Sequence, residues 1–327
     1  MTETMWAVTI AEDKSLTIGT AEKPTCGPRD VLVKVETAAL NRADLIQRMG
    51  LYPPPPGASN ILGLECAGTI TAIGHEVSDW AVGDRVCGLI PGGGYAEFAL
   101  VDQGSLFAIP DEMSFEQAGA LPEALMTVWI NLFDRCKLAM NESLLIHGGT
   151  SGIGTMAIQM ARHAGIKDIM ATAGSAEKCA FTETLGANLA INYKTDDFEK
   201  LVSDRGGADV ILDMVGGDYV QKNIAIAKIE GRICNIAYMQ GHKVELNLMP
   251  IMLKRLTITG STLRARPDAD KEIIRDAIIR DFWPAIIAGS IKPVIDSVYA
   301  FEDAEAAHAR MSAGGHIGKI LLSNNAA

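Results

Sequence analysis

The sequence predicts an α/β protein that combines a β-rich part with a doubly wound parallel sheet. Up to residue 121 the chain holds short alternating apolar runs, such as 31–35 and 69–73, broken by Gly, Pro and Asp, which is typical of strands and turns. From Pro122 onward, short apolar runs alternate with segments of helical periodicity, as in parallel strands joined by crossover helices. The length of 327 residues suits two domains.

Each expected element follows from a local pattern. In the second part, apolar runs predict parallel strands at residues 144–147, 169–173, 189–191, 210–213 and 232–236. Apolar residues at helical spacing over 269–288 predict a helix with a kink or stop at Pro284. The segments 294–300 and 317–322 again predict strands. The simplest assembly therefore returns the C-terminus to the first domain and inserts the other domain between its two parts.

The segment 142–155 holds the most informative motif. The apolar run 144–146 leads into His147 and then into glycines at 148, 149, 152 and 154, which predicts a buried strand, a tight turn and a helix start. Backbone N–H groups at such a helix start can hold a pyrophosphate. The spacing G-x-x-G-x-G differs from the usual dinucleotide fingerprint G-x-G-x-x-G, so the alternative is a turn that merely packs well. The helical periodicity that follows favours dinucleotide binding.

Composition and charge argue against several classes of function. The net charge of −11 and the lack of a Lys/Arg-rich stripe argue against nucleic acid as the main partner. The six cysteines and six histidines are dispersed without metal-like spacing, so we expect reduced, mostly buried thiols and no metal site. We also expect no signal peptide and no membrane span. A cytoplasmic protein is the resulting expectation.

Four segments together resemble a known family. They are Leu40-Asn41-Arg42-Ala43-Asp44, Gly63-Leu64-Glu65-Cys66-Ala67-Gly68, the glycine turn at 148–154 and Gly318-Lys319-Ile320. With them the chain resembles, over essentially its full length, the zinc-independent quinone oxidoreductases of the medium-chain dehydrogenase/reductase superfamily, the zeta-crystallin-like group. The resemblance implies a GroES-like catalytic domain (1–121 and 267–327), a Rossmann NADP-binding domain (122–266), a cofactor in the cleft between them and a homodimer.

The resemblance also implies chemistry without zinc. Zinc-dependent alcohol dehydrogenases of the same superfamily carry Gly-His-Glu where this chain has Gly63-Leu64-Glu65, and a cysteine ligand near the position of Asn41. The chain therefore lacks the ligands for the catalytic zinc ion, which is the Lewis acid of those alcohol dehydrogenases.

The end of the second predicted strand indicates the cofactor. NAD-specific domains place Asp or Glu about 20 residues after the glycines, but here the strand ends in Gly174 and Ser175, and Lys178 follows. We therefore expect NADPH, with Gly174, Ser175, Lys178 and Tyr193 around the 2′-phosphate; the Tyr193 contact comes from the resemblance. The alternative is that Lys178 is an ordinary solvated lysine on a helix.

Further cofactor contacts are expected at the pyrophosphate and at the nicotinamide. The turn residues Ser151, Gly152 and Ile153 are expected at the pyrophosphate. On the nicotinamide side, the resemblance implies polar contacts from Asn41 and Thr127, and backbone or packing contacts from Tyr238 and Leu263.

Quinones suit a site in which a hydride donor faces a flat conjugated acceptor. Asn41 and Tyr52 are the candidate catalytic residues, and Tyr52, beside the proline run 53–56, is the candidate acid; the alternative is an exposed aromatic or a dimer contact. The spacing Asn41, Asp44, Tyr52 also resembles that of mitochondrial-type enoyl-thioester reductases, so enoyl thioesters and other α,β-unsaturated carbonyls stay open as substrates. Asp44 is expected to bond backbone in its own turn. A third hypothesis is a non-catalytic crystallin-like or RNA-binding protein.

Overall fold

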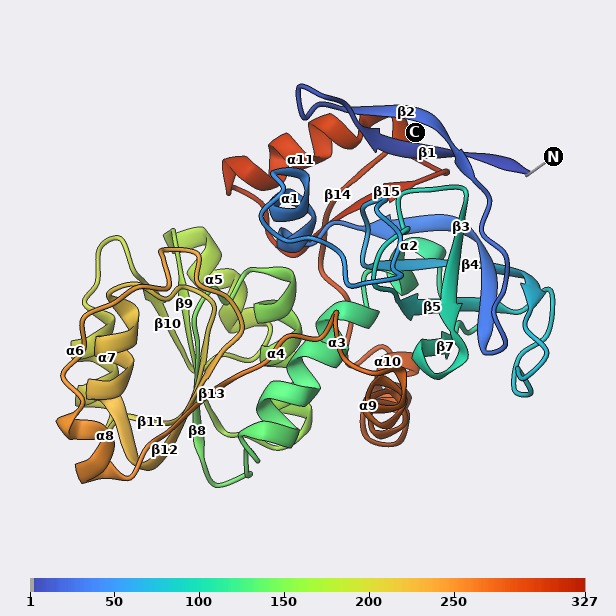
Figure 1. The fold of residues 1–327 in the computed structure, drawn as a ribbon. Coiled ribbons are helices and arrows are strands. Elements are labelled where there is room, and N and C mark those ends of the chain that lie inside the picture. The colour runs from blue at the N-terminus through green and yellow to red at the C-terminus, as the bar shows by residue number, and fades with distance from the viewer. Residues whose placement is uncertain (1–2, 327) are drawn as a thin grey trace. The chain divides into compact units, whose positions relative to one another are not determined.

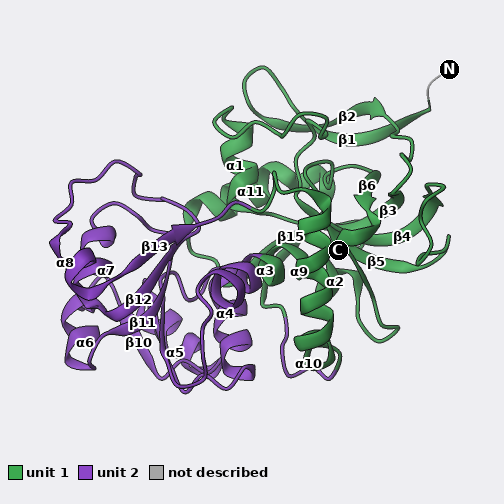
Figure 2. Cartoon of the chain, turned by 60° about the horizontal axis from the view of Figure 1, so that its bottom comes forward, with its two compact units in different colours: residues 1–126, 263–287, 293–327 green, residues 127–262, 288–292 purple. Residues whose placement is uncertain are grey.

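The computed structural model describes residues 3–326 and divides into two compact units (Figure 2). Unit 1 comprises residues 1–126, 263–287 and 293–327, and unit 2 comprises 127–262 and 288–292. Each unit has its own β-sheet and its own apolar core.

Unit 1 is built on a seven-stranded sheet with a separate two-stranded sheet beside it. The large sheet has the order β14-β15-β3-β4-β5-β7, with β6 also paired to β3, and β1 pairs with β2 in the small one. The strands are β1 Thr4–Ile10, β2 Leu16–Glu22, β3 Asp30–Ala39, β4 Glu65–Ile73, β5 Arg85–Leu89, β6 Phe98–Asp102, β7 Leu106–Ala108, β14 Ile295–Tyr299 and β15 Lys319–Ser323. Because β15 pairs antiparallel with β3, the C-terminal segment joins the first sheet.

The helices of unit 1 connect or cover the strands, and all but α9 and α11 are shorter than eight residues. They are α1 Arg42–Arg48, α2 Phe115–Gly119, α9 Asp268–Asp281, α10 Trp283–Ile287 and α11 Ala304–Ala313, with the 3₁₀ turns Gln103–Ser105 and Phe301–Asp303, and α3 Pro122–Val128 crosses the boundary of the two units. The single helix predicted over 269–288 is two helices with a break at Phe282. Pro284 lies in the first turn of α10, where its missing N–H costs nothing.

Unit 2 contains a six-stranded, fully parallel sheet in the order β10-β9-β8-β11-β12-β13. The strands are β8 Ser143–Ile146, β9 Asp168–Ala173, β10 Leu189–Asn192, β11 Ala208–Asp213, β12 Ala227–Asn235 and β13 Thr257–Gly260. The chain starts at β8, moves outward to β10 and then crosses to β11 on the other side of β8. The carboxyl ends of β8 and β11 are therefore the switch point at which ligands of such sheets bind.

Helices cover both faces of this sheet (Figure 1). They are α4 Gly152–His163, α5 Ala176–Thr184, α6 Phe198–Asp204, α7 Tyr219–Ile226 and α8 Met249–Lys254, preceded by the π-helix Trp129–Arg135. In Figure 1, α6, α7 and α8 lie on one side of the strands and α4 on the other, and α7 contacts both α6 and α8. All four residues of β8 are buried, as the continuous apolar run predicts.

Two strands of unit 2 differ from the sequence expectation. β12 begins at Ala227, five residues before the predicted start at 232. The first half was missed because it has no continuous buried apolar run: Ile229 and Glu230 are exposed, and Glu230 has a left-handed φ of 62°. β13 was not predicted, because its residues are mostly exposed at the edge of the sheet and show no buried pattern.

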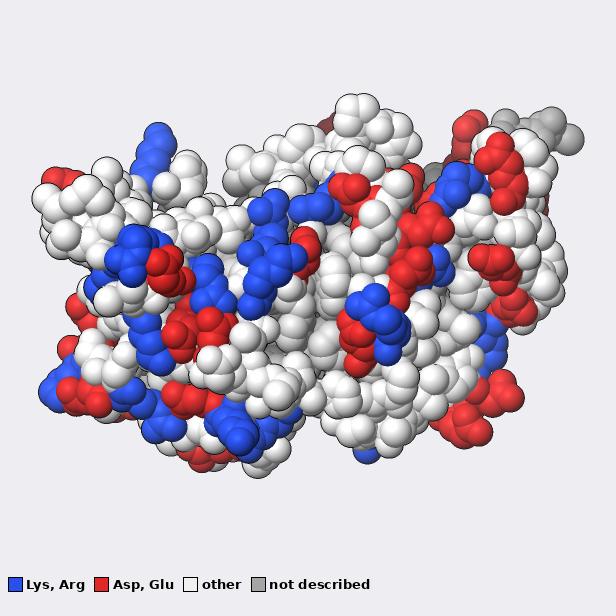
Figure 3. All heavy atoms as spheres, turned by 90° about the horizontal axis from the view of Figure 1, so that it is seen from below, with Lys and Arg blue, Asp and Glu red and all other residues white. Residues whose placement is uncertain are grey.

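One face of the molecule shows mixed charge. On the face in Figure 3, Lys and Arg side chains are interspersed with Asp and Glu side chains. No helix in the described residues 3–326 is both long and apolar enough to cross a bilayer. The cytoplasmic location stays a prediction.

Candidate functional site

The glycine turn of unit 2 follows β8 directly and starts α4. Ser151 caps this helix, since its Oγ accepts the N–H of Gly154 at 2.9 Å. Gly148 has a φ of 71°, and a Cβ on Gly154 would lie 2.2 Å from the carbonyl oxygen of Gly148. Only glycine fits at Gly154 without moving the turn. The N–H groups of Gly152 and Ile153 belong to the first helical turn, whose N–H groups have no partner within the helix, and can bind an anion.

Side chains from the next two strands meet beside this turn. Ser175 caps α5, and its Oγ accepts the N–H of Lys178 at 3.2 Å. The N–H of Tyr193 donates to the carbonyl of Ala173 at 3.1 Å, and a Cβ on Gly174 would lie 2.6 Å from the Tyr193 hydroxyl. The structure thus brings together Gly174, Ser175, Tyr193 and the backbone of Lys178 at the carboxyl ends of β9 and β10. Glu177 lies in the same first turn of α5 and is exposed.

Tyr238 lies next to the turn that follows β11. The N–H of Met239 donates to the carbonyl of Met214 at 3.2 Å, and a Cβ on Gly216 would touch the Tyr238 ring at 2.8 Å. The Ser151 hydroxyl in turn lies 3.6 Å from the Met214 sulfur. Ser151 and Tyr238 therefore line the two sides of the switch point, separated by Met214.

Thr127 is buried in the last part of α3, and its carbonyl accepts the side-chain amide of Asn131 at 2.8 Å. Asn131 Oδ1 accepts the Cys234 thiol at 3.0 Å and the Ser261 hydroxyl at 2.9 Å. Asn131 thus ties Thr127 to β12 and to the segment after β13. Sequence reasoning missed Asn131, because nothing in its local pattern marks it.

In unit 1, Asn41 belongs to a buried polar cluster. Its Oδ1 accepts Lys319 Nζ at 2.8 Å, and its Nδ2 donates to Glu65 Oε1 at 2.9 Å. Lys319 Nζ also forms an ion pair with Glu65 Oε1 at 2.5 Å, and Glu65 Oε2 accepts the N–H of Glu123 at 2.9 Å. Three of the four segments that carry the family resemblance therefore meet here, and the cluster fixes the orientation of the Asn41 amide. Sequence reasoning quoted Glu65 and Lys319 but missed their pairing.

Asp44 bonds backbone, as the sequence predicted. Its carboxylate accepts the N–H of Asn41 at 2.7 Å and the N–H of Gly63 at 2.9 Å. Burial raises the pKa of Asp44 to about 6. Because both oxygens are engaged in holding the turn before α1, Asp44 is a structural residue.

Tyr52 lies in the loop after α1, beside the buried Arg264. The Arg264 guanidinium lies 5.2 Å from the centre of the Tyr52 ring, and it donates to Gln47 Oε1 and to the Pro91 carbonyl, each at 2.7 Å. Burial raises the pKa of Tyr52, although Arg264 opposes the shift, so the hydroxyl keeps its proton at neutral pH. Leu263, next to Arg264, is buried.

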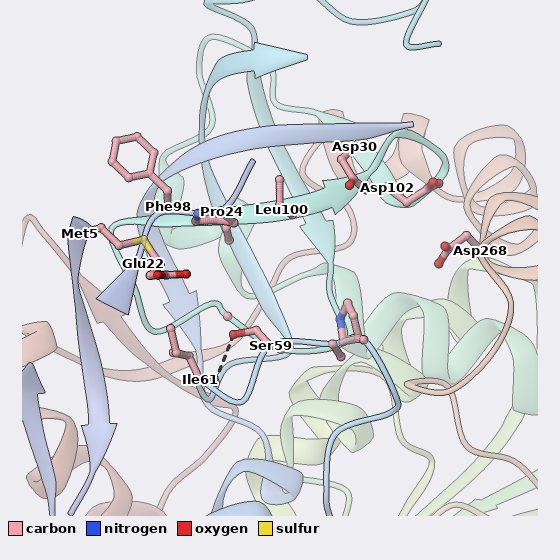
Figure 4. Close-up of a pocket in the computed structure, with 16 residues that line it drawn as sticks. Met5, Glu22, Pro24, Asp30, Ser59, Ile61, Phe98, Leu100, Asp102 and Asp268 are labelled. Carbon is pink, nitrogen blue, oxygen red and sulfur yellow. Dashed lines mark hydrogen bonds between the residues drawn. The ribbon is translucent and has the colours of Figure 1, made fainter. Parts of the chain in front are cut away.

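Two further features bear on ligand binding. Among the described residues 3–326, no group of three or more His, Cys, Asp or Glu could hold a metal ion. A hollow of about 250 Å³ in unit 1 is lined by carboxylates, glycines and apolar side chains such as Met5, Ile61 and Phe98 (Figure 4). Its Asp102 pairs with Arg29 at 3.1 Å, and its Asp30 accepts the N–H of Gly27 at 2.8 Å. None of the predicted site residues lines this hollow.

Comparison with known proteins identifies the family. Residues 27–111 match the alcohol dehydrogenase GroES-like domain, and residues 152–277 match the family model named zinc-binding dehydrogenase. A quinone oxidoreductase from Mus musculus is 31% identical over 306 residues, which cover 91% of this chain and 90% of the relative. The chain belongs to the medium-chain dehydrogenase/reductase superfamily. Within it, the chain is quinone oxidoreductase-like, so unit 1 is GroES-like and unit 2 Rossmann-like.

Other relatives in the superfamily carry different names. A synaptic vesicle membrane protein VAT-1 homolog from Danio rerio is 32% identical over 321 residues, but this chain spans only 65% of its length. The solved structure of CurK enoyl reductase superposes with a TM-score of 0.84 at 27% identity, covering 98% of this chain and 99% of that one. The superfamily thus establishes an oxidoreductase, without specifying its substrate.

Proposed function

We propose that this protein reduces quinones by hydride transfer from NADPH, without zinc. The observation that carries the proposal is the group formed by Gly174, Ser175, Lys178 and Tyr193 beside the glycine turn. At this strand end an Asp or Glu would bind the ribose of NAD, but here the chain has Gly174 and Ser175. A 2′-phosphate there meets the Lys178 ammonium and the N-terminus of α5, both of which favour negative charge.

The remaining cofactor contacts follow the glycine turn. The N–H groups of Gly152 and Ile153 would hold the pyrophosphate. Ser151, whose own N–H donates to the Gly148 carbonyl at 2.9 Å, is proposed to lie beside it. Asn41, Thr127, Tyr238 and Leu263 are proposed as contacts on the nicotinamide side, in keeping with the family resemblance. The bound nicotinamide supplies the hydride.

Tyr52 and Asn41 are the proposed catalytic residues. A quinone that receives a hydride also takes one proton to become a hydroquinone, and the protonated Tyr52 hydroxyl is a suitable donor. Arg264, stacked on the Tyr52 ring, stabilises the tyrosinate left after that transfer. Asn41 offers an amide whose orientation is fixed by Lys319 and Glu65.

The second candidate is a reductase of enoyl thioesters or other α,β-unsaturated carbonyls. Likeness to the solved enoyl reductase favours it, and a protonated Tyr52 could equally donate to the α-carbon after hydride addition. Quinones rank first because of the quinone oxidoreductase relatives.

A homodimer formed through unit 2 is also part of the proposal. Strand β13 is one of the two edge strands of the parallel sheet, and its Ile258 is 40% exposed. The nearby α8 buries none of its residues, and its Met252 and Leu253 are more than half exposed. An open sheet edge beside exposed apolar residues suits a self-complementary contact with a second copy. Light scattering should show a dimer that Ile258→Lys with Met252→Glu converts to a monomer.

The first experiment compares NADPH and NADH oxidation with 1,4-benzoquinone, 9,10-phenanthrenequinone and crotonyl-coenzyme A. Quinone turnover that prefers NADPH supports the proposal. Turnover confined to the thioester favours the second candidate function, an enoyl-thioester reductase. NADPH binding without turnover of any acceptor favours the non-catalytic hypothesis, and a preference for NADH overturns the cofactor assignment.

A matched pair of variants in one helical turn tests the 2′-phosphate pocket. Lys178→Ala should weaken NADPH about 10- to 100-fold while sparing NADH, because a hydrogen bond to a charged group is lost. Glu177→Ala, in the same turn, should not weaken NADPH. Equal effects of Lys178→Ala on both nucleotides would contradict the assignment.

A further inference from the structure

A network of buried polar side chains lies beneath the glycine turn of unit 2. His147 Nε2 lies 2.8 Å from Asn223 Oδ1, and Asn223 Nδ2 donates to Asp213 Oδ2 at 3.2 Å. On its other side, His147 Nδ1 lies 3.2 Å from Thr172 Oγ1, which accepts the N–H of Gly148 at 3.3 Å. Each of the four side chains is at most 1% exposed. They come from the ends of β8, β9 and β11 and from α7.

The hydrogen-bond partners fix the position of every proton in this network. Because Asn223 uses its amide N–H on Asp213, its Oδ1 faces His147 and requires a proton on His147 Nε2. His147 Nδ1 is then an acceptor for the Thr172 hydroxyl. Burial lowers the pKa of His147, so the ring stays neutral. The rings of Phe198 and Tyr219, with centroids 5.0 and 4.8 Å away, enclose it edge-on.

At each of its two ends the network binds backbone N–H groups, and these ends lie on opposite sides of the switch point. At one end is the N–H of Gly148. At the other, Asp213 Oδ1 accepts the N–H groups of residues 215 and 216 at 2.7 and 3.3 Å. These two turns contact each other, because Met214 Sδ lies 3.6 Å from Ser151 Oγ and would lie 2.7 Å from a Cβ on Gly148. One network therefore sets the spacing of the two turns.

We propose that His147, Thr172, Asn223 and Asp213 are positioning residues for the cofactor pyrophosphate. They hold the turn after β8 in the conformation that presents the N–H groups of α4, and they keep the turn after β11 clear of it. A network that only stabilised the core could end on core side chains, whereas this one ends on the backbone of the binding turns. The inference rests on the proposed binding of NADPH.

The test compares NADPH with adenosine 2′-monophosphate, which lacks the pyrophosphate, by titration calorimetry on the full chain. Thr172→Val keeps the shape of the side chain but removes the hydroxyl, so Gly148 N–H and His147 Nδ1 both lose their partner. We expect the Kd for NADPH to rise about tenfold, because the turn that presents the N–H groups of α4 is no longer held in place, while the Kd for adenosine 2′-monophosphate changes less than about twofold. Thr172→Ser should restore NADPH affinity.

Thr182→Val is the matched control. Thr182 is equally buried in unit 2, and its hydroxyl donates only to the Cys179 carbonyl of its own helix, at 2.8 Å. We expect it to leave both affinities unchanged. Equal effects of the two valine substitutions, or parallel weakening of both ligands by Thr172→Val, would overturn the inference alone. A wild-type protein that binds neither ligand would overturn the proposed function and the inference with it.

The proton assignment has its own readout. Nitrogen NMR of the His147 ring, assigned by comparison with His147→Gln, should show a neutral ring protonated at Nε2. A ring protonated at Nδ1 would contradict the network.

Discussion

Replacing Lys319 by methionine should strongly destabilise unit 1. The Lys319 and Glu65 side chains are 5% and 0% exposed and form an ion pair at 2.5 Å. Methionine fills most of the space of the lysine stem but leaves the Glu65 carboxylate buried without a cation. Breaking a buried pair in this way costs about 3–5 kcal/mol. At roughly 2–4 °C per kcal/mol for a domain of this size, the melting temperature of unit 1 should fall by about 6–20 °C.

The matched control is Lys271→Met. Lys271 is as buried as Lys319, with 5% side-chain exposure, but its partner Asp268 is 56% exposed. Loss of the lysine leaves Asp268 hydrated, so the cost should stay near the ~0–1 kcal/mol of a surface pair. Scanning calorimetry on both variants measures the difference.

A second substitution identifies the cause of the destabilisation. Adding Glu65→Gln to Lys319→Met removes the stranded charge, although the amide can no longer accept from both Asn41 and the N–H of Glu123. The double variant should therefore be more stable than Lys319→Met, yet about 1–3 kcal/mol below the wild type. If Lys319→Met costs no more than Lys271→Met, or if Glu65→Gln lowers stability further, the buried-charge argument is wrong.

Three further substitutions test other parts of the structure. Gly154→Ala places a Cβ 2.2 Å from the Gly148 carbonyl oxygen, so calorimetry should show lower stability and NADPH affinity should fall at least about tenfold as the turn shifts. Burial lowers the pKa of His308 to about 4. The stability that the neutral ring contributes is therefore fully present above the unfolded pKa near 6.5 and is lost as the pH falls toward 4. This contribution is on the order of 3 kcal/mol. The stability difference between wild type and His308→Gln should shrink accordingly in denaturation curves between pH 7 and 4. Arg264→Lys cannot reproduce the stacking on Tyr52 or all of the guanidinium bonds, so quinone kcat/KM should fall about tenfold, and an unchanged value would exclude a role for this contact.

Sequence patterns predicted most of unit 2 because its signals are local. The apolar run of β8, the glycines after it and the periodicity of α4 lie next to one another in the chain, and each reports on its own backbone. The exposed strand β13 and the first half of β12 gave no such signal. The π-helix Trp129–Arg135 was also missed, because its residues have no distinct propensity pattern.

The polar networks were beyond sequence reasoning for a different reason. Lys319 and Glu65 are 254 residues apart, and His147 and Asn223 are 76 apart. No periodicity links such positions, so each residue taken alone is an ordinary polar side chain. The prediction for Asp44 was confirmed because one of its partners, Asn41, lies only three residues away.

In both units, hydrogen bonds on either side of an asparagine fix the orientation of its side-chain amide. In unit 2, Asn223 lies between the Asp213 carboxylate and His147; in unit 1, Asn41 lies between the Glu65 carboxylate and Lys319. An amide has one donor end and one acceptor end, so a carboxylate on one side and a basic group on the other leave it a single orientation. Both networks are satisfied within the protein, which means that the Gly148 turn and the Asn41 amide are in place before a ligand arrives. Under the proposed function, such preorganised polar groups cost no reorganisation during the reaction, which is a reason for each unit to retain a buried charge where an apolar core would suffice for folding.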